Sequence, residues 1–473
     1  MEILTHNLFW LLPFCLCIGG YVAWNIGAND VSNAMGTSVG SKTLTLKQAI
    51  LVAAIFEFIG AAFFGNEVSE TLQEGLFDSS AWSNHALITT QGMLASLLSA
   101  GVWMHLASLY KLPVSTTHSI VGAIVGFALI AGGIDSIYWG KVSSIALSWI
   151  LSPCLGAMAS FVVFFSLKKW IFAQPDPLTR ARKILPIMSF VSVAWIGTLW
   201  LALDTHETSI HKVAGVFLLA FCIACLIWAA ERWAVPKESK EEKAFAQARA
   251  SFVVLQRRKR MLLLETDENP KAWDSMKEVE NELENLTPIF QKTTSSDLEK
   301  QQYHKLEMLF GILQVVTACL MAFAHGSNDV ANAIGPLNAC LSNLAKSGIA
   351  EASPMLSYTL PLGGIFIVIG LATWGWRVIE TIGSGITELT PSRGFSAEFG
   401  ASSTIFLASK LGLPVSTTHT LVGAVIGVGF AGGFASINTK TLREIATSWF
   451  VTIPAGALLS IVFFSLLSWL VPT

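Results

Sequence analysis

Charged side chains are scarce in this chain of 473 residues: 13% of the residues are Asp, Glu, Lys or Arg, whereas 53% are hydrophobic. A soluble protein carries about a quarter charged residues. The charges that do occur are concentrated, because residues 236–307 hold 13 of the 30 basic and 14 of the 32 acidic side chains. The rest of the chain is apolar nearly throughout. This excludes a water-soluble fold and predicts an all-α integral membrane protein.

The sequence also lacks the marks of several other protein classes. Its net charge of −2 gives no basis for binding nucleic acid. Cys222 and Cys225 lie one helical turn apart without His or Cys partners at ligand spacing, so we interpret them as packing residues and expect no tightly bound cofactor. The first apolar run has no basic flank or small-residue cleavage site, so it predicts a retained helix rather than a signal peptide.

About twelve apolar segments are long enough to cross or re-enter a membrane. They lie near 8–27, 46–65, 86–110, 116–132, 142–167, 187–203, 213–234, 308–325, 357–382, 396–410, 417–434 and 444–470. The charged window between them reads as amphipathic helix with a break at Asn269-Pro270, either a solvated linker or a regulatory insertion. We therefore expect a membrane repeat over 1–168, two connecting helices over 169–235, a charged helical insertion over 236–307 and a second repeat over 308–473.

The chain contains an internal duplication. Ala28-Asn-Asp-Val-Ser-Asn-Ala34 recurs as Ser327-Asn-Asp-Val-Ala-Asn-Ala333, and Leu112-Pro-Val-Ser-Thr-Thr-His118 recurs as Leu413-Pro-Val-Ser-Thr-Thr-His419. Seven crossings, an odd number, separate equivalent points, so we expect the second repeat to be inverted relative to the first. Re-entrant hairpins at the Ser-Thr-Thr-His tips would not change this parity.

Basic loops predict the orientation of the repeats. Basic residues follow the fifth segment, form a cluster at Arg257-Arg-Lys-Arg260 and precede the last segment, whereas the loop after the second segment is acidic. The positive-inside rule then places the charged window in the cytoplasm and both termini outside the cell membrane, inner or plasma.

The two Asn-Asp motifs predict a buried site. Gly and Asn are poor in helix interiors, so we expect a helix that breaks near Gly27 and restarts at Asn29 and Asp30, with the same arrangement at Asn328 and Asp329. A restarted helix presents an N-terminus that suits an anion. Carboxylates at membrane depth are costly and are therefore candidate functional groups, although each Asp could simply cap its own helix.

The Ser-Thr-Thr runs predict the other side of the same site. Each run follows a proline that ends the preceding helix, and its hydroxyl groups suit a tetrahedral oxyanion. The alternative is that these hydroxyls only cap the next helix or bond to its preceding turn. The candidate anion ligands here are Ser115, Thr116, Thr117, Ser416, Thr417 and Thr418. His118 and His419, which close the runs, are either hydrogen-bond partners or proton carriers.

Two glutamates distinguish the repeats. Glu57 aligns with Ile367, and Glu398 has only Ser96 or Leu97 opposite it. A lone Glu in an apolar helix needs a cation, a proton or a packing partner. Together with Asp30, Asn33, Asp329 and Asn332, we take Glu57 and Glu398 as candidate ligands of a coupling cation.

These repeated motifs resemble the signatures of the inorganic phosphate transporter family known as PiT. Gly27 to Ala34 and Gly326 to Ala333 are similar to its Asn-Asp signature, and 113–118 and 414–419 are similar to its Pro-Val-Ser-Thr-Thr-His segments. The resemblance implies a twelve-segment inverted-repeat symporter that carries phosphate near the midplane, driven by sodium or protons. It also implies that phosphate binds to Asn29, Asp30, Asn328, Asp329 and the two Ser-Thr-Thr runs, and that Glu57 and Glu398 serve transport.

We therefore expect a secondary transporter that imports inorganic phosphate with a cation. Bound cations would neutralise Asp30 and Asp329, which otherwise repel a dianion. A carboxylate also favours phosphate over sulfate, since phosphate still carries a proton that it can donate. A sulfate carrier and an anion channel are the alternatives. An intramembrane hydrolase is disfavoured, because Ser115 and His118 are too close in sequence for nucleophile and base. The sequence is compatible with a homo-oligomer as well as with a monomer.

Overall fold

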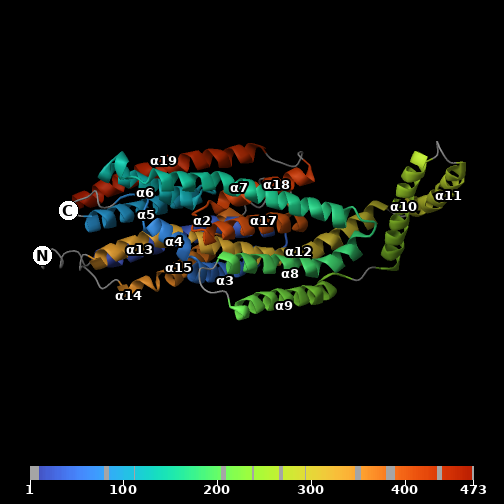
Figure 1. Cartoon of the computed structure of the whole chain (residues 1–473), viewed down its shortest axis with the longest axis horizontal. Helices are drawn as coiled ribbons and strands as arrows, with labels where there is room; N and C mark the ends of the chain where they lie inside the picture. The colour runs from blue at the N-terminus through green and yellow to red at the C-terminus, as the bar shows by residue number, and fades with distance from the viewer. Residues whose placement is uncertain are drawn as a thin grey trace. The chain divides into compact units, whose positions relative to one another are not determined.

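The computed structural model describes residues 10–78, 85–110, 112–203, 209–236, 239–265, 270–292, 295–346, 353–379, 389–433 and 439–470. It divides into two compact units. Unit 1 comprises Met1–Phe164, Ser192–Val216 and Gln314–Thr473, and unit 2 comprises Phe165–Val191 and Phe217–Leu313. Regular structure in the described part of the chain is helical (Figure 1), apart from one isolated bridge between Phe77 and Ile137.

Eight helical spans among the described residues are long and apolar enough to cross a membrane, and three shorter apolar helices accompany them. The chain is therefore a multi-pass helical membrane protein. Each of the twelve predicted segments contains a helix, although the one near 357–382 is longer than its helix, which ends at Thr373. The helices around the candidate site are α2 (Leu11–Gly40), α3 (Leu46–Phe64), α4 (Asn66–Gln73), α5 (His85–Leu109), α6 (Thr116–Gly132), α7 (Trp139–Leu167), α12 (Ser295–Asp329), α13 (Ala331–Lys346), α15 (Thr359–Thr373), α17 (Pro391–Lys410), α18 (Thr417–Gly432) and α19 (Thr439–Leu470).

The two halves of the duplication interleave in unit 1. Helix α6 packs on α19, α13 packs on α5, and α15 packs on both α2 and α3. Figure 1 shows α6, early in the chain, beside the C-terminal α19. Helix α5 also packs on α6, and α17 on α18, so each Ser-Thr-Thr run lies between two packed helices.

Helix α2 runs without a break from Leu11 to Gly40, so the predicted break near Gly27 is wrong. In the second copy, Val330 forms a single turn residue between α12 and α13. Helical bonding continues through this turn, because Val330 N donates to Gly326 O at 3.4 Å and Ile334 N donates to Val330 O at 2.9 Å. The predicted helix restart at the Asn-Asp motif is therefore absent from the first copy and reduced to one turn residue in the second.

Close helix packing explains the glycines of these motifs. A Cβ atom at Gly27 would lie 1.9 Å from Ile367 O, and one at Gly326 would lie 2.2 Å from Glu57 O. The reciprocal contacts repeat the pattern, with Gly370 against Trp24 O and Gly60 against Phe323 O. The glycines let α2 cross α15, and α12 cross α3, with the backbones in contact.

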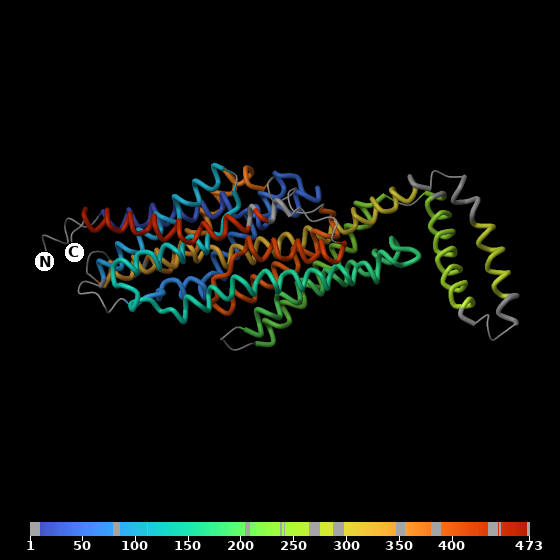
Figure 2. The backbone as a smooth tube through the Cα atoms, turned by 90° about the horizontal axis from the view of Figure 1, so that it is seen from above, coloured from blue at the N-terminus to red at the C-terminus, as the bar shows by residue number. Residues whose placement is uncertain are grey.

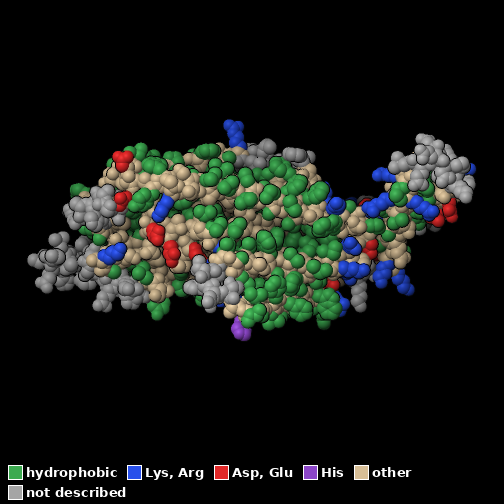
Figure 3. Space-filling view, in the orientation of Figure 1, with side chains coloured by type: hydrophobic (Ala, Val, Ile, Leu, Met, Phe, Trp, Pro, Cys, Tyr) green, Lys and Arg blue, Asp and Glu red, His purple; other side chains and the backbone are tan. Residues whose placement is uncertain are grey.

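Unit 2 contains the charged window. Its helices include most of α9 (Ile210–Ala234), with α10 (Lys240–Glu265) and α11 (Pro270–Lys292), which pack together (Figure 2). The predicted helix break at Asn269-Pro270 agrees with the start of α11 at Pro270. Lys305 Nζ pairs with Glu242 Oε2 at 2.8 Å and ties α12 to α10. On the face in Figure 3, hydrophobic side chains cover much of the surface of the apolar helices, and Lys and Arg side chains gather around α10.

Candidate functional site

The asparagine of each Asn-Asp motif holds the tip of its own half. Asn29 Nδ2 donates to Ser108 Oγ at 2.9 Å and to Leu112 O at 3.2 Å, and Asn29 Oδ1 accepts from Val114 N at 3.3 Å. Asn328 repeats this pattern, since its Nδ2 donates to Ser409 Oγ at 3.0 Å and to Leu413 O at 3.3 Å. These amide groups thus bind the segment that leads into each Ser-Thr-Thr run, and their N–H groups are engaged within the protein.

The serine of each run caps a helix. Ser115 Oγ accepts from His118 N and Ser416 Oγ accepts from His419 N, both at 3.2 Å, so α6 and α18 begin at Thr116 and Thr417. The sequence predicted these two helix starts correctly. Each cap leaves the hydroxyl hydrogen of the serine available, and a helix N-terminus favours negative charge nearby.

The threonines bind the Asn-Asp motifs of both halves. Asn33 Nδ2 donates to Thr418 Oγ1 at 2.8 Å, and Asn332 Nδ2 donates to Thr116 Oγ1 at 3.0 Å and to Thr117 Oγ1 at 3.2 Å. Thr417 Oγ1 donates to Asp329 Oδ2 at 2.8 Å. The structure therefore brings both motifs and both runs together at one buried place.

Five oxygen atoms of the two Asn-Asp motifs accept no hydrogen bond from any described residue. They are Asp30 Oδ2, Asn33 Oδ1, Asn328 Oδ1, Asp329 Oδ1 and Asn332 Oδ1, and all five residues are at most 1% exposed. A buried carboxylate or amide oxygen without a donor costs free energy unless something else satisfies it. Because oxygen is the ligand that hard cations prefer, the set suits an alkali cation.

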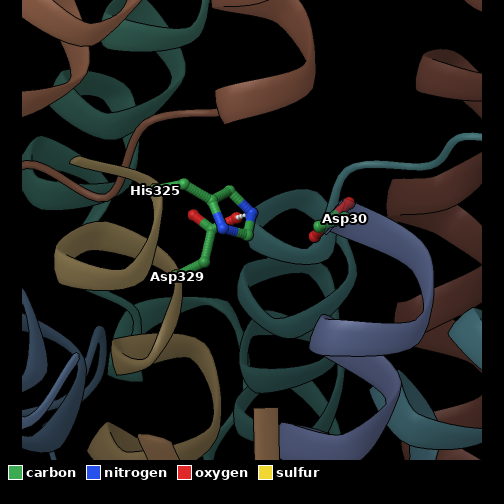
Figure 4. Close-up of side chains that lie close together, drawn as sticks. All are labelled: Asp30, His325 and Asp329. Atoms are coloured by element: carbon green, nitrogen blue, oxygen red, sulfur yellow. Dashed lines mark ion pairs between the residues drawn. The ribbon is translucent and has the colours of Figure 1, made fainter. Parts of the chain in front are cut away.

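A histidine that the sequence analysis missed lies among these carboxylates. Asp30, His325 and Asp329 each offer a ligand atom within 4.8 Å of the others, with Asp30 on α2 facing the other two on α12 (Figure 4). His325 Nε2 lies 3.0 Å from Asp329 Oδ2, and Nδ1 lies 3.3 Å from Glu57 Oε1. Both nitrogens can donate at once only when the ring is protonated.

The positions equivalent to Glu57 and His325 in the duplication hold an apolar pair. Aligning the two glycines places Ile26 opposite His325, and Ile367 is opposite Glu57. All four side chains are fully buried. The Ile26–His325 difference was the available signal for His325, and it becomes visible only when the two copies are aligned residue by residue.

Glu398 lies in a separate buried cluster of polar side chains. Its Oε1 accepts from Thr37 Oγ1 and Ser38 Oγ, both at 2.6 Å, and from Gln314 Nε2 at 3.0 Å, while Oε2 accepts from Thr317 Oγ1 at 2.7 Å. No Lys, Arg or His in the described part of the chain pairs with this carboxylate. The cluster joins α2, α12 and α17 through four neutral donors around one acidic group.

The two histidines that close the runs form part of an aromatic stack. The rings of His118 and His419 meet edge to face with centroids 4.4 Å apart. Trp149 packs on His118 at 3.9 Å, and Trp449 packs on His419 at 3.5 Å. The stack joins the two tips, which favours the structural interpretation of both histidines over a proton carrier.

The second tip is also fastened to α4. Lys410 pairs with Glu67, and Thr71 Oγ1 donates to Gly412 O at 2.7 Å. Gly412 has a φ of +65°, a left-handed conformation that favours glycine in the turn after α17. These contacts hold the segment that leads from α17 into the Ser416 cap.

Three comparisons with known proteins agree. Residues 26–460 match the model of the "Phosphate transporter family". The chain is 42% identical to "Inorganic phosphate transporter 2-1, chloroplastic" of Arabidopsis thaliana over 95% of this chain and 70% of that one, and 40% identical to a "Putative phosphate permease" of Chlamydia trachomatis over 97% and 99%. A solved structure described as "The sodium-dependent phosphate transporter" superposes with a TM-score of 0.75 at 32% identity, covering 97% of this chain and 99% of the other.

Proposed function

This chain belongs to the phosphate transporter family, and we propose that it imports phosphate by sodium symport through the buried place where its two Asn-Asp motifs meet its two Ser-Thr-Thr runs. One observation carries the proposal. Buried oxygens without a donor come from both halves, at Asp30 and Asn33 and at Asp329 and Asn332, and they lie next to threonines that belong to helix starts. Sodium would bind these oxygens, and phosphate would bind at the helix starts.

Phosphate would take hydrogen bonds from the hydroxyls of the two Ser-Thr-Thr runs. Thr117 donates to Val415 O and Thr417 to Asp329 in the present arrangement, so these two hydroxyls would have to turn to reach it. Asn33 and Asn332 donate to threonines of the runs, so the threonine oxygens are oriented by protein groups. Asn29 and Asn328 would act as positioning residues, because their amide hydrogens hold the tips. This refines our expectation that they bind phosphate directly.

Electrostatic repulsion determines the order in which sodium and phosphate bind. Asp30, Glu57 and Asp329 place three carboxyl groups around one imidazole, so acidic groups outnumber basic groups at the site. A phosphate dianion is repelled from such a site until cations neutralise it. Sodium would therefore bind first and phosphate second, which couples the two fluxes.

Alternating access would follow from the inverted repeat. Each Ser-Thr-Thr run would be the tip of a re-entrant hairpin made by α5 with α6 or by α17 with α18, and the two tips would face each other near the midplane. The charged window would lie in the cytoplasm and both termini outside. Exposure of the loaded site to one side and then to the other would carry phosphate inward.

Glu398 would hold a further sodium ion that regulates or drives the cycle. Its carboxylate is buried among hydroxyl groups without a charged partner, and those hydroxyl oxygens can turn their lone pairs toward a cation.

Replacing Glu398 by glutamine tests this ion. The variant Glu398→Gln keeps the size of the side chain and one of its two acceptor oxygens but removes its negative charge. We expect the sodium concentration for half-maximal uptake to rise about tenfold. Glu74→Gln, at a side chain that is 72% exposed, is the matched control and should leave it unchanged. An unaltered sodium dependence in Glu398→Gln would remove this ion from the scheme.

The Glu57–His325 pair can be tested by copying the apolar pair at the equivalent positions. His325→Ile alone leaves the buried Glu57 carboxylate without its partner and should lower stability by about 3–5 kcal/mol. The double variant with Glu57→Ile recreates the apolar pair of Ile26 and Ile367, so its melting temperature should recover most of this loss. Uptake should nevertheless fall at least about tenfold, because Asp329 loses its imidazolium. Normal uptake in a stable double variant would show that the pair serves packing alone.

Uptake into proteoliposomes tests the proposed function. We expect accumulation of labelled phosphate under an inward sodium gradient, no accumulation under a proton gradient alone, and saturation with phosphate concentration. Arsenate should compete and sulfate should not. Accumulation driven only by protons would reassign the coupling ion, and competition by sulfate equal to that by arsenate would reassign the substrate.

A further inference from the structure

A cavity of about 700 Å³ lies behind the first Ser-Thr-Thr tip. One wall is α5, at Trp103 and Leu106, the opposite wall is α19, at Val451, and the tip itself contributes Leu112 and Val114. Leu106, Leu112 and Val451 are between 42% and 47% exposed. The cavity is thus an apolar groove between two membrane-spanning helices and is open on one side.

The charge at the groove is positive. Arg443, near the start of α19, lines it, and none of the described residues that line it is acidic. An apolar groove with one cation at its edge complements an amphiphile that has a hydrocarbon chain and an anionic head group. It is poorly suited to free phosphate, which would have to shed water against tryptophan, leucine and valine side chains without compensating hydrogen bonds.

The groove contacts the part of the protein that carries the proposed site. Leu112 and Val114 bond to Asn29, and Ser448 Oγ, also at the groove, donates to Pro113 O at 3.4 Å. In the second half, Lys410 and Gly412, which lie just before the tip, are fastened to α4. Among the residues that the structure describes, the first tip therefore borders an open groove and the second tip is held by α4.

We propose that this groove binds one anionic phospholipid, with an acyl chain between α5 and α19 and its phosphate on Arg443, and that the bound lipid supports the first tip as α4 supports the second. The lipid occupies the space behind Leu112 and Val114 and limits how far the tip can move. Transport then depends on the lipid composition of the membrane.

Photo-crosslinking tests the site directly. Purified protein is reconstituted with phosphatidylglycerol that carries a diazirine in its acyl chain, and the labelled peptides are identified by mass spectrometry. We expect labelling within residues 103–114 and 443–451. Arg443→Gln should reduce it about fivefold, the contribution of one interfacial arginine to binding an anionic lipid. Val451→Trp should block it by filling the groove, whereas Val462→Trp, at a residue on the same helix that is also exposed, should not. Labelling that neither Arg443→Gln nor Val451→Trp reduces would overturn the proposal.

Uptake measurements distinguish a groove that binds lipid from a groove through which Arg443 attracts phosphate. Wild-type uptake should be faster in liposomes of phosphatidylcholine with phosphatidylglycerol than in phosphatidylcholine alone, and Arg443→Gln should lose this difference. Arg232→Gln, which removes an arginine stacked on Trp228 of α9, should retain it. In pure phosphatidylcholine the KM for phosphate should be equal in wild type and Arg443→Gln. A raised KM there would mean that Arg443 attracts phosphate itself, and equal wild-type rates in both membranes would refute the supporting role of the lipid.

Discussion

Replacing Asp30 by asparagine is expected to reduce sodium-driven phosphate uptake by roughly ten- to a hundredfold, the effect of losing a charged contact at a buried site. The Asp30 Oδ2 atom has no donor in the described part of the chain, and the residue is 1% exposed. An amide of the same shape still accepts the hydrogen bond of 3.1 Å from Asn33 through its oxygen. What it lacks is the charge that attracts sodium, so uptake should fall while the fold is retained.

Two further variants sharpen this result. Asp329→Asn should lose uptake to a similar extent but should also be less stable, because Asp329 additionally pairs with His325 and accepts from Thr417. Asp135→Asn, in the exposed turn between α6 and α7, makes the same chemical change outside the site and should leave uptake unchanged. If Asp30→Asn transported phosphate at the wild-type rate with the wild-type sodium dependence, the proposed sodium site would be untenable.

Replacing Gly27 by alanine is expected to prevent correct folding. The new methyl group would lie 1.9 Å from Ile367 O, 2.8 Å from Ile367 C and 2.9 Å from Leu371 N, all of them backbone atoms of α15. A flexible side chain could move aside, but two crossing helix backbones cannot do so locally. Overpacking in a well-packed core costs about 1–3 kcal/mol and more where backbone must shift. We expect the protein to aggregate on extraction or to melt far below the wild type.

Gly215→Ala is the matched control, since it makes the same change in α9 where nothing lies within 4 Å of the added atom. There alanine should stabilise the helix by about 1 kcal/mol. Thermal unfolding of the two purified variants therefore should shift in opposite directions. A Gly27→Ala protein that melted normally would contradict the close crossing of α2 and α15 and would return Gly27 to the role of a helix break.

The parts of the site that could be predicted from the sequence are those set by local chemistry. A proline followed by Ser-Thr-Thr stops one helix and caps the next, because the required bonds lie within four residues. The sequence therefore predicted the starts of α6 and α18 correctly. The duplication predicted that equivalent residues of both halves would matter, and the structure brings Asn33 to Thr418 and Asn332 to Thr116.

The features that were missed depend on distant partners. Gly27 and Asn29 looked like a helix break because both are poor helix formers, yet Ile367 explains the glycine and the Ser108–Val114 segment explains the asparagine. Tertiary contacts outweighed helix propensity here. His325 was missed for a related reason. Its partner Glu57 lies on α3, and a repeated motif draws attention to what two copies share rather than to where they differ.

Equilibrium binding of phosphate tests the central claim, that sodium held between the two Asn-Asp motifs makes the site able to accept the anion. Labelled phosphate is titrated into the purified protein while sodium replaces potassium at constant ionic strength. We predict that phosphate affinity rises at least about tenfold with sodium, within the usual range of coupling between two ligands, and that Asp30→Asn abolishes this rise. Equal phosphate affinity in sodium and in potassium would contradict it.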